Sequence, residues 1–175
     1  MITIDVAQSP ADIEEIRALF TEYAASLYFD LCFQDFDTEL ASLPGSYAAP
    51  DGCLFLARAG NGQAAGCVGI RRLVDGGAEM KRLYVRADWR GQGMGRRLAD
   101  SAIEFARAAG YQALRLDTIP DQMANADAMY RAMGFEETAA YYDNPRGITR
   151  CGWQVEPAQE PGGSAASAAI GLRHG

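Results

Sequence analysis

The alternation of apolar and polar residues predicts that the chain begins with a strand followed by a helix. Residues 1–6 alternate with the period of a half-buried strand. Ser9 is a suitable helix N-cap, and Pro10 suits the first helical position. Apolar residues then recur on one helical face as far as about Ser26, namely Ile13, Ile16, Leu19, Phe20 and Tyr23.

Three more strands are predicted in the middle of the chain. They run over Cys53–Arg58, Ala64–Leu73 and Ala78–Arg86, and glycine-containing turns join them as a meander. A long amphipathic helix follows from Met94 to Ala109, where Gly110 ends it. Its alanines permit close packing on a sheet.

The last third of the chain predicts a strand, a short helix and two final strands. The strand at Ala113–Thr118 is separated from the Glu79 strand by a helix, so the two can pair in parallel. The helix spans Asn125–Met133, and the final strands span 135–138 and 150–155. Residues 157–175 lack periodicity and predict a flexible tail rich in Gly, Ala, Ser and Pro.

Residues 27–50 are harder to interpret, because aromatic side chains are interleaved with acidic ones. A short helix is expected at 37–41. The aromatic residues can simply pack on the core while the carboxylates face water. Alternatively, the segment lines a substrate pocket through residues such as Phe33 and Asp37, and its charge then favours a cationic or amine substrate. Both interpretations stay open.

Composition excludes several classes of function. The net charge of −7 over 175 residues leaves no general basic surface for nucleic acid. The only histidine, His174, lies in the predicted tail, so neither a Ser-His nor a Cys-His catalytic pair is expected. We expect reduced cysteines, no metal and, without a signal peptide or apolar span, a cytoplasmic protein; the cysteines are Cys32, Cys53, Cys67 and Cys151.

The segment Arg90-Gly91-Gln92-Gly93-Met94-Gly95 carries the strongest chemical signal. It lies between a strand and a helix N-terminus, where free N–H groups and the helix dipole favour an anion. Arg96 and Arg97 add charge, which predicts phosphate or pyrophosphate binding. A plain glycine-rich loop with solvated arginines is the simplest alternative. A dinucleotide fingerprint fits poorly, because residue 96 is Arg instead of Gly.

The same hexapeptide matches the Arg/Gln-x-x-Gly-x-Gly/Ala signature of the GNAT acetyltransferase superfamily. Farther along, Ala126-x-x-x-Tyr130-x-x-x-Gly134-Phe135 resembles a second landmark of that superfamily, and the resemblance covers residues 54–155. It implies an α/β layered fold in a single GNAT-like domain over residues 1–156. The central sheet would be mixed but mostly antiparallel, with about six or seven strands and about four flanking helices.

The resemblance also implies acetyl-CoA as acetyl donor and an amine as acceptor, without a metal. Backbone groups of Leu83, Tyr84 and Val85 would pair with the pantetheine amides, and Arg90 would order the loop. The full set of implied cofactor-binding residues is Leu83, Tyr84, Val85, Arg90, Gly91, Gln92, Gly93, Met94, Gly95, Arg96 and Arg97.

Tyr130 matches the superfamily tyrosine that serves as general acid to the CoA thiolate. Glu79 matches a strand position where some members place a general base, acting directly or through water. Tyr130 could instead be a core residue, and Glu79 a solvated or salt-bridged glutamate. Many relatives have an Asn that reaches the cofactor where this chain has Met123, and the nearby Asn125 lies on a different helical face.

Tyr141, Tyr142 and Asn144 are expected to border the acceptor pocket. The acceptor itself stays open between a small-molecule amine and a peptide or protein amine, and a homodimer is compatible with the superfamily. The chief alternative is a non-catalytic module that binds acyl-CoA for regulation. Such a module would need the arginine-glycine loop, but neither Glu79 nor Tyr130.

Overall fold

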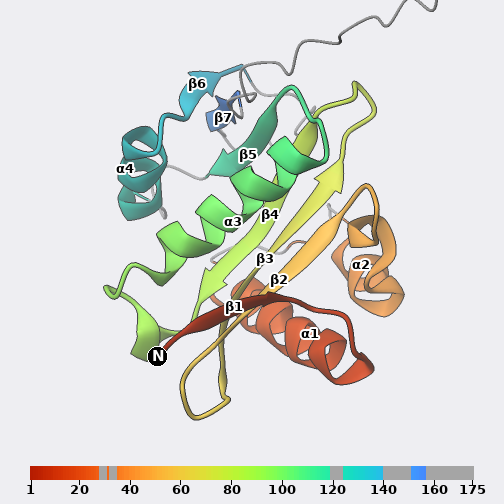
Figure 1. Ribbon diagram of the computed structural model, residues 1–175, viewed down its shortest axis with the longest axis vertical. Helices are drawn as coiled ribbons and strands as arrows, with labels where there is room; N and C mark the ends of the chain where they lie inside the picture. The colour runs from red at the N-terminus through yellow and green to blue at the C-terminus, as the bar shows by residue number, and fades with distance from the viewer. Residues whose placement is uncertain (28–30, 32–34, 119–123, 140–150, 157–175) are drawn as a thin grey trace, which may run out of the picture.

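The computed structural model describes residues 1–27, 31, 35–118, 124–139 and 151–156. Seven strands of this part form one sheet in the order β1-β2-β3-β4-β5-β7-β6 (Figure 1). Only β4 and β5 are parallel neighbours, and every other adjacent pair is antiparallel. The strands are β1 Thr3–Val6, β2 Cys53–Arg58, β3 Ala64–Arg72, β4 Ala78–Val85, β5 Leu114–Thr118, β6 Glu136–Thr138 and β7 Cys151–Val155. The predicted mixed, mostly antiparallel sheet is confirmed.

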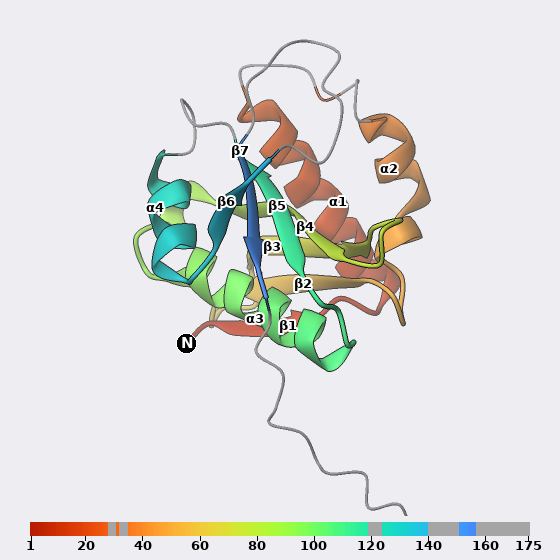
Figure 2. The ribbon, with the colours of Figure 1, turned by 90° about the horizontal axis from the view of Figure 1, so that it is seen from above.

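Helices cover both faces of this sheet, as the view from above shows (Figure 2). One face carries α1 (Pro10–Ala25) and α2 (Phe36–Ser42), and the other carries α3 (Met94–Ala108) and α4 (Ala124–Ala132). Short 3-10 turns lie at Gly45–Tyr47 and Ala87–Trp89. Predicted and observed bounds agree within two residues. In the part described, no helix is both long and apolar enough to cross a membrane.

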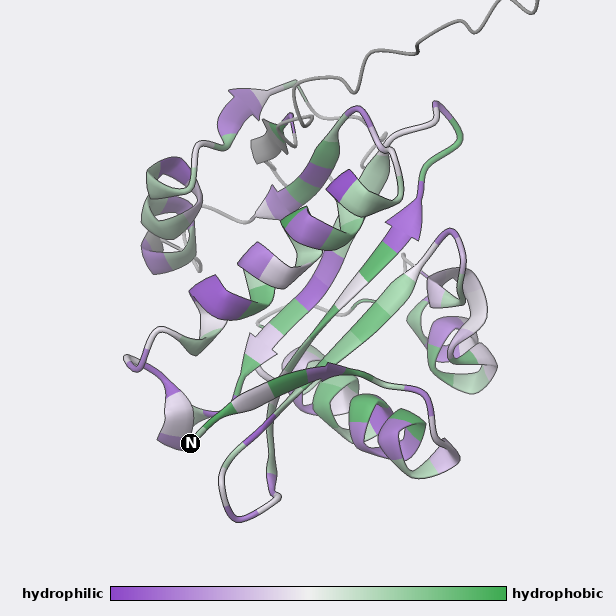
Figure 3. Ribbon diagram, in the orientation of Figure 1, coloured by the Kyte–Doolittle hydropathy of each residue, from purple (hydrophilic) through white to green (hydrophobic). Residues whose placement is uncertain are grey.

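Each face of the sheet has its own hydrophobic core. On the α3 face, Ala99, Ala102 and Ala106 are fully buried, which lets the helix lie close to the sheet as predicted. The opposite core is built on Ile16, Leu19 and Phe20 of α1 together with strand residues of β2 and β3. Figure 3 shows the resulting stripes, with hydrophilic residues on the outer side of α3. Cys53 and Cys67 are buried free thiols, as expected.

The parallel contact between β4 and β5 is short. Only Ala78↔Leu114 and Glu79↔Arg115 are in register, so the two strands separate beyond Glu79. Because β4 continues to Val85, its last six residues have no paired partner on β5. The sheet therefore opens at its centre, next to the start of α3.

A β-bulge lies within this separated part of β4. Between the pairs Gly69↔Lys81 and Cys67↔Tyr84, β4 carries one residue more than β3. The bulge falls at Arg82–Leu83, and the backbone of Arg82 is left-handed with φ +57°. A left-handed non-glycine residue inside a strand is uncommon and requires support from its surroundings.

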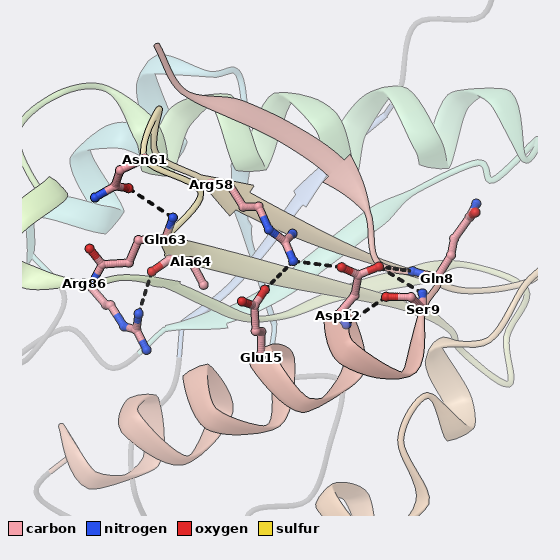
Figure 4. Close-up of polar contacts among 9 residues, drawn as sticks. All are labelled: Gln8, Ser9, Asp12, Glu15, Arg58, Asn61, Gln63, Ala64 and Arg86. Carbon is pink, nitrogen blue, oxygen red and sulfur yellow. Dashed lines mark hydrogen bonds and ion pairs between the residues drawn. The ribbon is translucent and has the colours of Figure 1, made fainter.

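The N-terminus of α1 is held by a capping box that confirms Ser9 as the N-cap (Figure 4). The Asp12 amide donates to Ser9 Oγ (3.1 Å), and the Ser9 amide donates to Asp12 Oδ2 (2.9 Å). Arg58 of β2 pairs with both Asp12 and Glu15, which fixes the helix to the sheet. The hydrogen bonds from Ser9, then that from Gln8, hold the pKa of Asp12 well below its usual range.

We predict that Asp12→Asn lowers the free energy of unfolding by about 1 kcal/mol at pH 7. Because the folded-state pKa of Asp12 is depressed, its contribution is present above about pH 4 and is lost as pH falls below that value. Urea unfolding of both proteins at pH 7 and pH 3 should show the difference shrinking at pH 3. An undiminished difference at pH 3 would contradict this, and Glu14→Gln on the exposed side of α1 is the control.

Candidate active site

The glycine-rich bend ahead of α3 forms an open helix N-terminus. Gly91 and Gly93 have φ of +73° and +75°, a left-handed conformation that favours glycine at these two positions. Gly93 is the N-cap of α3, and no side chain caps the helix. A Cβ placed on Gly91 or Gly93 would meet nothing within 4 Å. The first N–H groups of α3, which have no partner within the helix, therefore lie beside open space that an anion can enter.

Arginines surround this bend, and Arg90 fastens it to the end of β4. Arg90 Nε donates to the Val85 carbonyl (2.8 Å), and its guanidinium lies 5.8 Å from the centroid of the Tyr84 ring. Arg97 donates to the Ile2 carbonyl (3.0 Å), while Arg96 lies 4.0 Å from Asp100 on the exposed side of α3. Arg90 thus ties the bend to the end of β4, and its expected role in ordering the loop around a cofactor stays a prediction.

The unpaired part of β4 runs from the glycine bend back to Glu79. There β4 and β5 are still paired, and this pairing closes the opening between the two strands. Leu83 and Val85 pack against the α3 core, whereas Tyr84 contacts the α1 layer, where its ring lies 6.3 Å from that of Tyr23. These three residues have no register pair with β5. Their backbone edge is consequently placed to pair with an extended ligand, in the way that a peptide adds to a sheet.

Tyr130 of α4 is a buried phenol, with 5% of its surface exposed and its ring 5.4 Å from that of Phe135. Burial above all, then the nearby Tyr23 and Asp127, raises the pKa of Tyr130 well above its usual value. The hydroxyl therefore stays protonated and can donate a proton or a hydrogen bond. Asp127, three residues earlier, has a buried Oδ1 that accepts no hydrogen bond from the described residues.

Comparison with known proteins identifies this arrangement. The profile of the Acetyltransferase (GNAT) family matches residues 13–135. The chain belongs to the GNAT acetyltransferase family. It is 37% identical over 145 residues to an uncharacterized N-acetyltransferase from Schizosaccharomyces pombe, covering 82% of this chain and 88% of that protein. It is also 35% identical over 112 residues to an aminoglycoside N(6')-acetyltransferase type 1 from Stenotrophomonas maltophilia, covering 59% and 72%.

Solved structures agree on the fold. A GNAT-family acetyltransferase from Staphylococcus aureus Mu50 superposes with a TM-score of 0.74 at 19% identity, covering 90% of this chain and all of that one. The expected family, fold class and enzyme class are thereby confirmed. This chain is an N-acetyltransferase of a family that takes its acetyl group from acetyl-CoA.

The residues of this GNAT chain fit the chemistry of acetyl-CoA. The uncapped start of α3 and the open space over Gly91 and Gly93 suit the negative charges of a diphosphate. The free edge of β4 suits amide groups, and the unpartnered Oδ1 of Asp127 could accept from an N–H donor. Asp127 was not predicted as a site residue from the sequence, although its position one helical turn before Tyr130 could have indicated it.

Glu79 lies at the closed end of the opening and is 1% exposed. Arg71 of β3 donates from Nε to Glu79 Oε2 (2.8 Å), so the salt-bridged alternative considered for Glu79 is realised in the structure. The same strand carries Lys81, the only lysine of the whole chain. Burial lowers the pKa of Lys81 to about 8, and the charge of Glu79 partly opposes that effect. Sequence reasoning assigned no role to Lys81 or Arg71.

The acidic segment before β2 is only partly described. Glu39 forms an ion pair with Arg82 of β4, whereas Asp37 is exposed in the first turn of α2. Within the described part of the segment, the charge of Glu39 is thus already balanced by Arg82. The predicted preference for a cationic acceptor gains no support from it. Phe33, Tyr141, Tyr142 and Asn144, together with Met123, lie outside the described residues, so their expected roles stay predictions.

We predict that the Lys81 amine titrates near pH 8 instead of near 10.4. Because the chain has a single lysine, ¹³C-lysine labelling gives one NMR signal whose midpoint reports this group directly. Glu79→Gln should lower the midpoint further, since it removes a charge that favours the protonated amine. A midpoint above 10 in the unaltered enzyme would show that Lys81 is solvated.

Proposed function

We propose that this enzyme moves an acetyl group from acetyl-CoA to a primary amine by direct attack of the amine on the thioester. The observation that carries the proposal is the opening between β4 and β5, which has an anion-binding helix start at one end and Glu79 at the other. N–H groups of residues 92–96 would hold the pyrophosphate, whereas the Arg97 amide donates to the Gly93 carbonyl (3.1 Å) and Arg97 would contribute its charge. Backbone groups of Leu83, Tyr84 and Val85 would hold the pantetheine amides.

Two side chains are proposed to move protons. When bound, acetyl-CoA supplies a thioester already activated toward an amine. Tyr130 would donate the proton that the departing thiolate takes up, and its raised pKa keeps the hydroxyl protonated until then. Glu79 would accept the proton that the amine loses. It would do so directly or through a water, with the carboxylate held in place by its contact with Arg71.

For the acceptor we propose a small-molecule amine. The named function of the Stenotrophomonas relative, acetylation of an aminoglycoside, supports this class without identifying the compound. The helices α1 and α2 lie on the face of the sheet that carries Glu79 and Arg82. Phe33, Asp37, Tyr141, Tyr142 and Asn144 remain proposed neighbours of the acceptor.

We predict that Gly93→Asp weakens binding of acetyl-CoA at least about tenfold relative to Gly93→Asn. The two side chains have nearly the same shape, and Asn and Asp both tolerate a left-handed backbone, so only the charge differs. Isothermal titration calorimetry with acetyl-CoA measures the effect. Equal affinities of the two variants for acetyl-CoA would show that the pyrophosphate does not bind at this loop. Binding of NAD(P)H by the unaltered enzyme would contradict the proposal altogether.

We predict that Tyr130→Phe lowers kcat roughly a hundredfold while the Kd for acetyl-CoA changes less than about threefold. Release of free thiol in the presence of an amine acceptor gives kcat, and calorimetry gives the Kd. Tyr111→Phe is the matched control, because this buried tyrosine donates to the Asp51 carbonyl away from the opening. Undiminished turnover in Tyr130→Phe would reject Tyr130 as the acid. Acetyl-CoA binding without turnover of any amine would favour the regulatory module.

A further inference from the structure

The bulge in β4 is held by an ion pair that reaches it from α2. Arg82 donates from Nε to Glu39 Oε1 (3.1 Å) and from Nη2 to Glu39 Oε2 (2.6 Å), a two-point contact of fixed geometry. The side chains of Arg82 and Glu39 are 3% and 13% exposed. Tyr47 adds a hydrogen bond from its hydroxyl to Glu39 Oε1 (2.6 Å), so a third side chain orients the carboxylate.

Further contacts surround the same arginine. Its guanidinium lies 5.1 Å from the centroid of the Phe36 ring and 5.9 Å from that of Tyr23. The buried thiol of Cys67 lies 3.6 Å from the Arg82 carbonyl and donates to it. Both the side chain and the carbonyl of the bulged residue are thus fixed, and α1, α2 and β3 all take part.

These contacts matter because they hold Arg82 in a left-handed backbone conformation that is unfavourable for it. A residue with a Cβ is destabilised in the left-handed region relative to glycine, so the bulge persists only while its surroundings favour it. The bulge also decides which peptide groups face the opening beside β5. A strand without the extra residue would turn every following side chain and peptide group to the opposite face.

We propose that the Glu39–Arg82 pair is a positioning device for acetyl transfer, which holds the bulge and thereby aims the peptide groups of Leu83–Val85 into the opening. This inference rests on the proposed function, since those peptide groups are the ones assigned to the cofactor. Arg86 and Glu22 form a second two-point pair just beyond Val85, with distances of 2.6 and 2.9 Å. The cofactor edge is therefore bracketed by two arginine–glutamate pairs from the α1–α2 layer.

The comparison of Arg82→Gly with Arg82→Ala tests this positioning role. Both variants remove the guanidinium and leave Glu39 in the same surroundings, but only glycine adopts φ near +57° without strain. We expect kcat of Arg82→Gly to exceed that of Arg82→Ala by about tenfold and its Kd for acetyl-CoA to be at least about threefold lower, because the peptide groups that the bulge aims are the ones assigned to the cofactor. Equal kcat values in the two folded variants would overturn the proposal.

Glu39→Gln provides a second measurement, which does not depend on whether the two Arg82 variants fold. It keeps the shape of the side chain and a hydrogen-bond acceptor, but it removes the charge that holds Arg82. We expect kcat to fall at least about fivefold and the Kd for acetyl-CoA to rise at least about threefold, because the peptide groups of Leu83–Val85 are no longer held in place although the α3 bend is untouched. Unchanged kcat would count against the proposal. Glu15→Gln, which weakens an ion pair with Arg58 away from the bulge, is the control.

These outcomes separate this inference from the proposed function. If the unaltered enzyme binds acetyl-CoA and releases thiol with an amine, the proposed function stands, whatever the Arg82 and Glu39 variants do. If it does neither, the proposed function fails first. Circular dichroism and thermal unfolding of each variant, recorded at the assay temperature, ensure that kcat is compared only among folded proteins.

Discussion

The early end of the parallel pairing between β4 and β5 is the constraint on which the rest of the site depends. After Glu79↔Arg115 the two strands part, and β4 is left with a free backbone edge between its neighbour and the start of α3. In a fully paired sheet those peptide groups would hydrogen-bond to β5, and none would be left to bind an extended ligand. The open edge, the glycine bend beside it and the two helical layers then form one continuous arrangement.

Separating two central strands exposes polar backbone in the middle of the molecule, and charged side chains compensate on the α1–α2 face. Arg71 pairs with Glu79, and Arg82 pairs with Glu39, so both of these carboxylates are matched by a guanidinium. Such pairs contribute little net stability, because the cost of desolvation offsets the attraction between the charges. Their value here is geometric, since the two-point contact between Arg82 and Glu39 holds the bulge and the contact between Arg71 and Glu79 holds the other end of β4.

Much of this fold could be predicted from the sequence, because the signals are local. The apolar run in Cys53–Arg58, the period of the α3 helix and the glycine bend each indicate their own structure within a few residues. The bulge at Arg82 could not be predicted in this way, because it depends on Glu39, which lies 43 positions away. A signal was nevertheless present: Lys81 and Arg82 are adjacent charges inside a strand, where strict alternation would bury one of them in the α3 core.

The same contrast between local signals and long-range contacts applies to the acetyl donor and the amine acceptor. In the proposed reaction, backbone groups at a helix start and along a strand edge would hold the donor, and short motifs such as the Arg90–Gly95 segment are enough to indicate the family. On the acceptor side the proposal relies on side chains of the α1–α2 layer, and the positions of the described ones, such as Glu39, depend on long-range packing. A family whose members share the donor can therefore keep the bend and the opening while the α1–α2 layer changes with the acceptor. In this chain, that layer also holds the bulge, so changes that adapt it to a new amine must preserve the contact between Glu39 and Arg82.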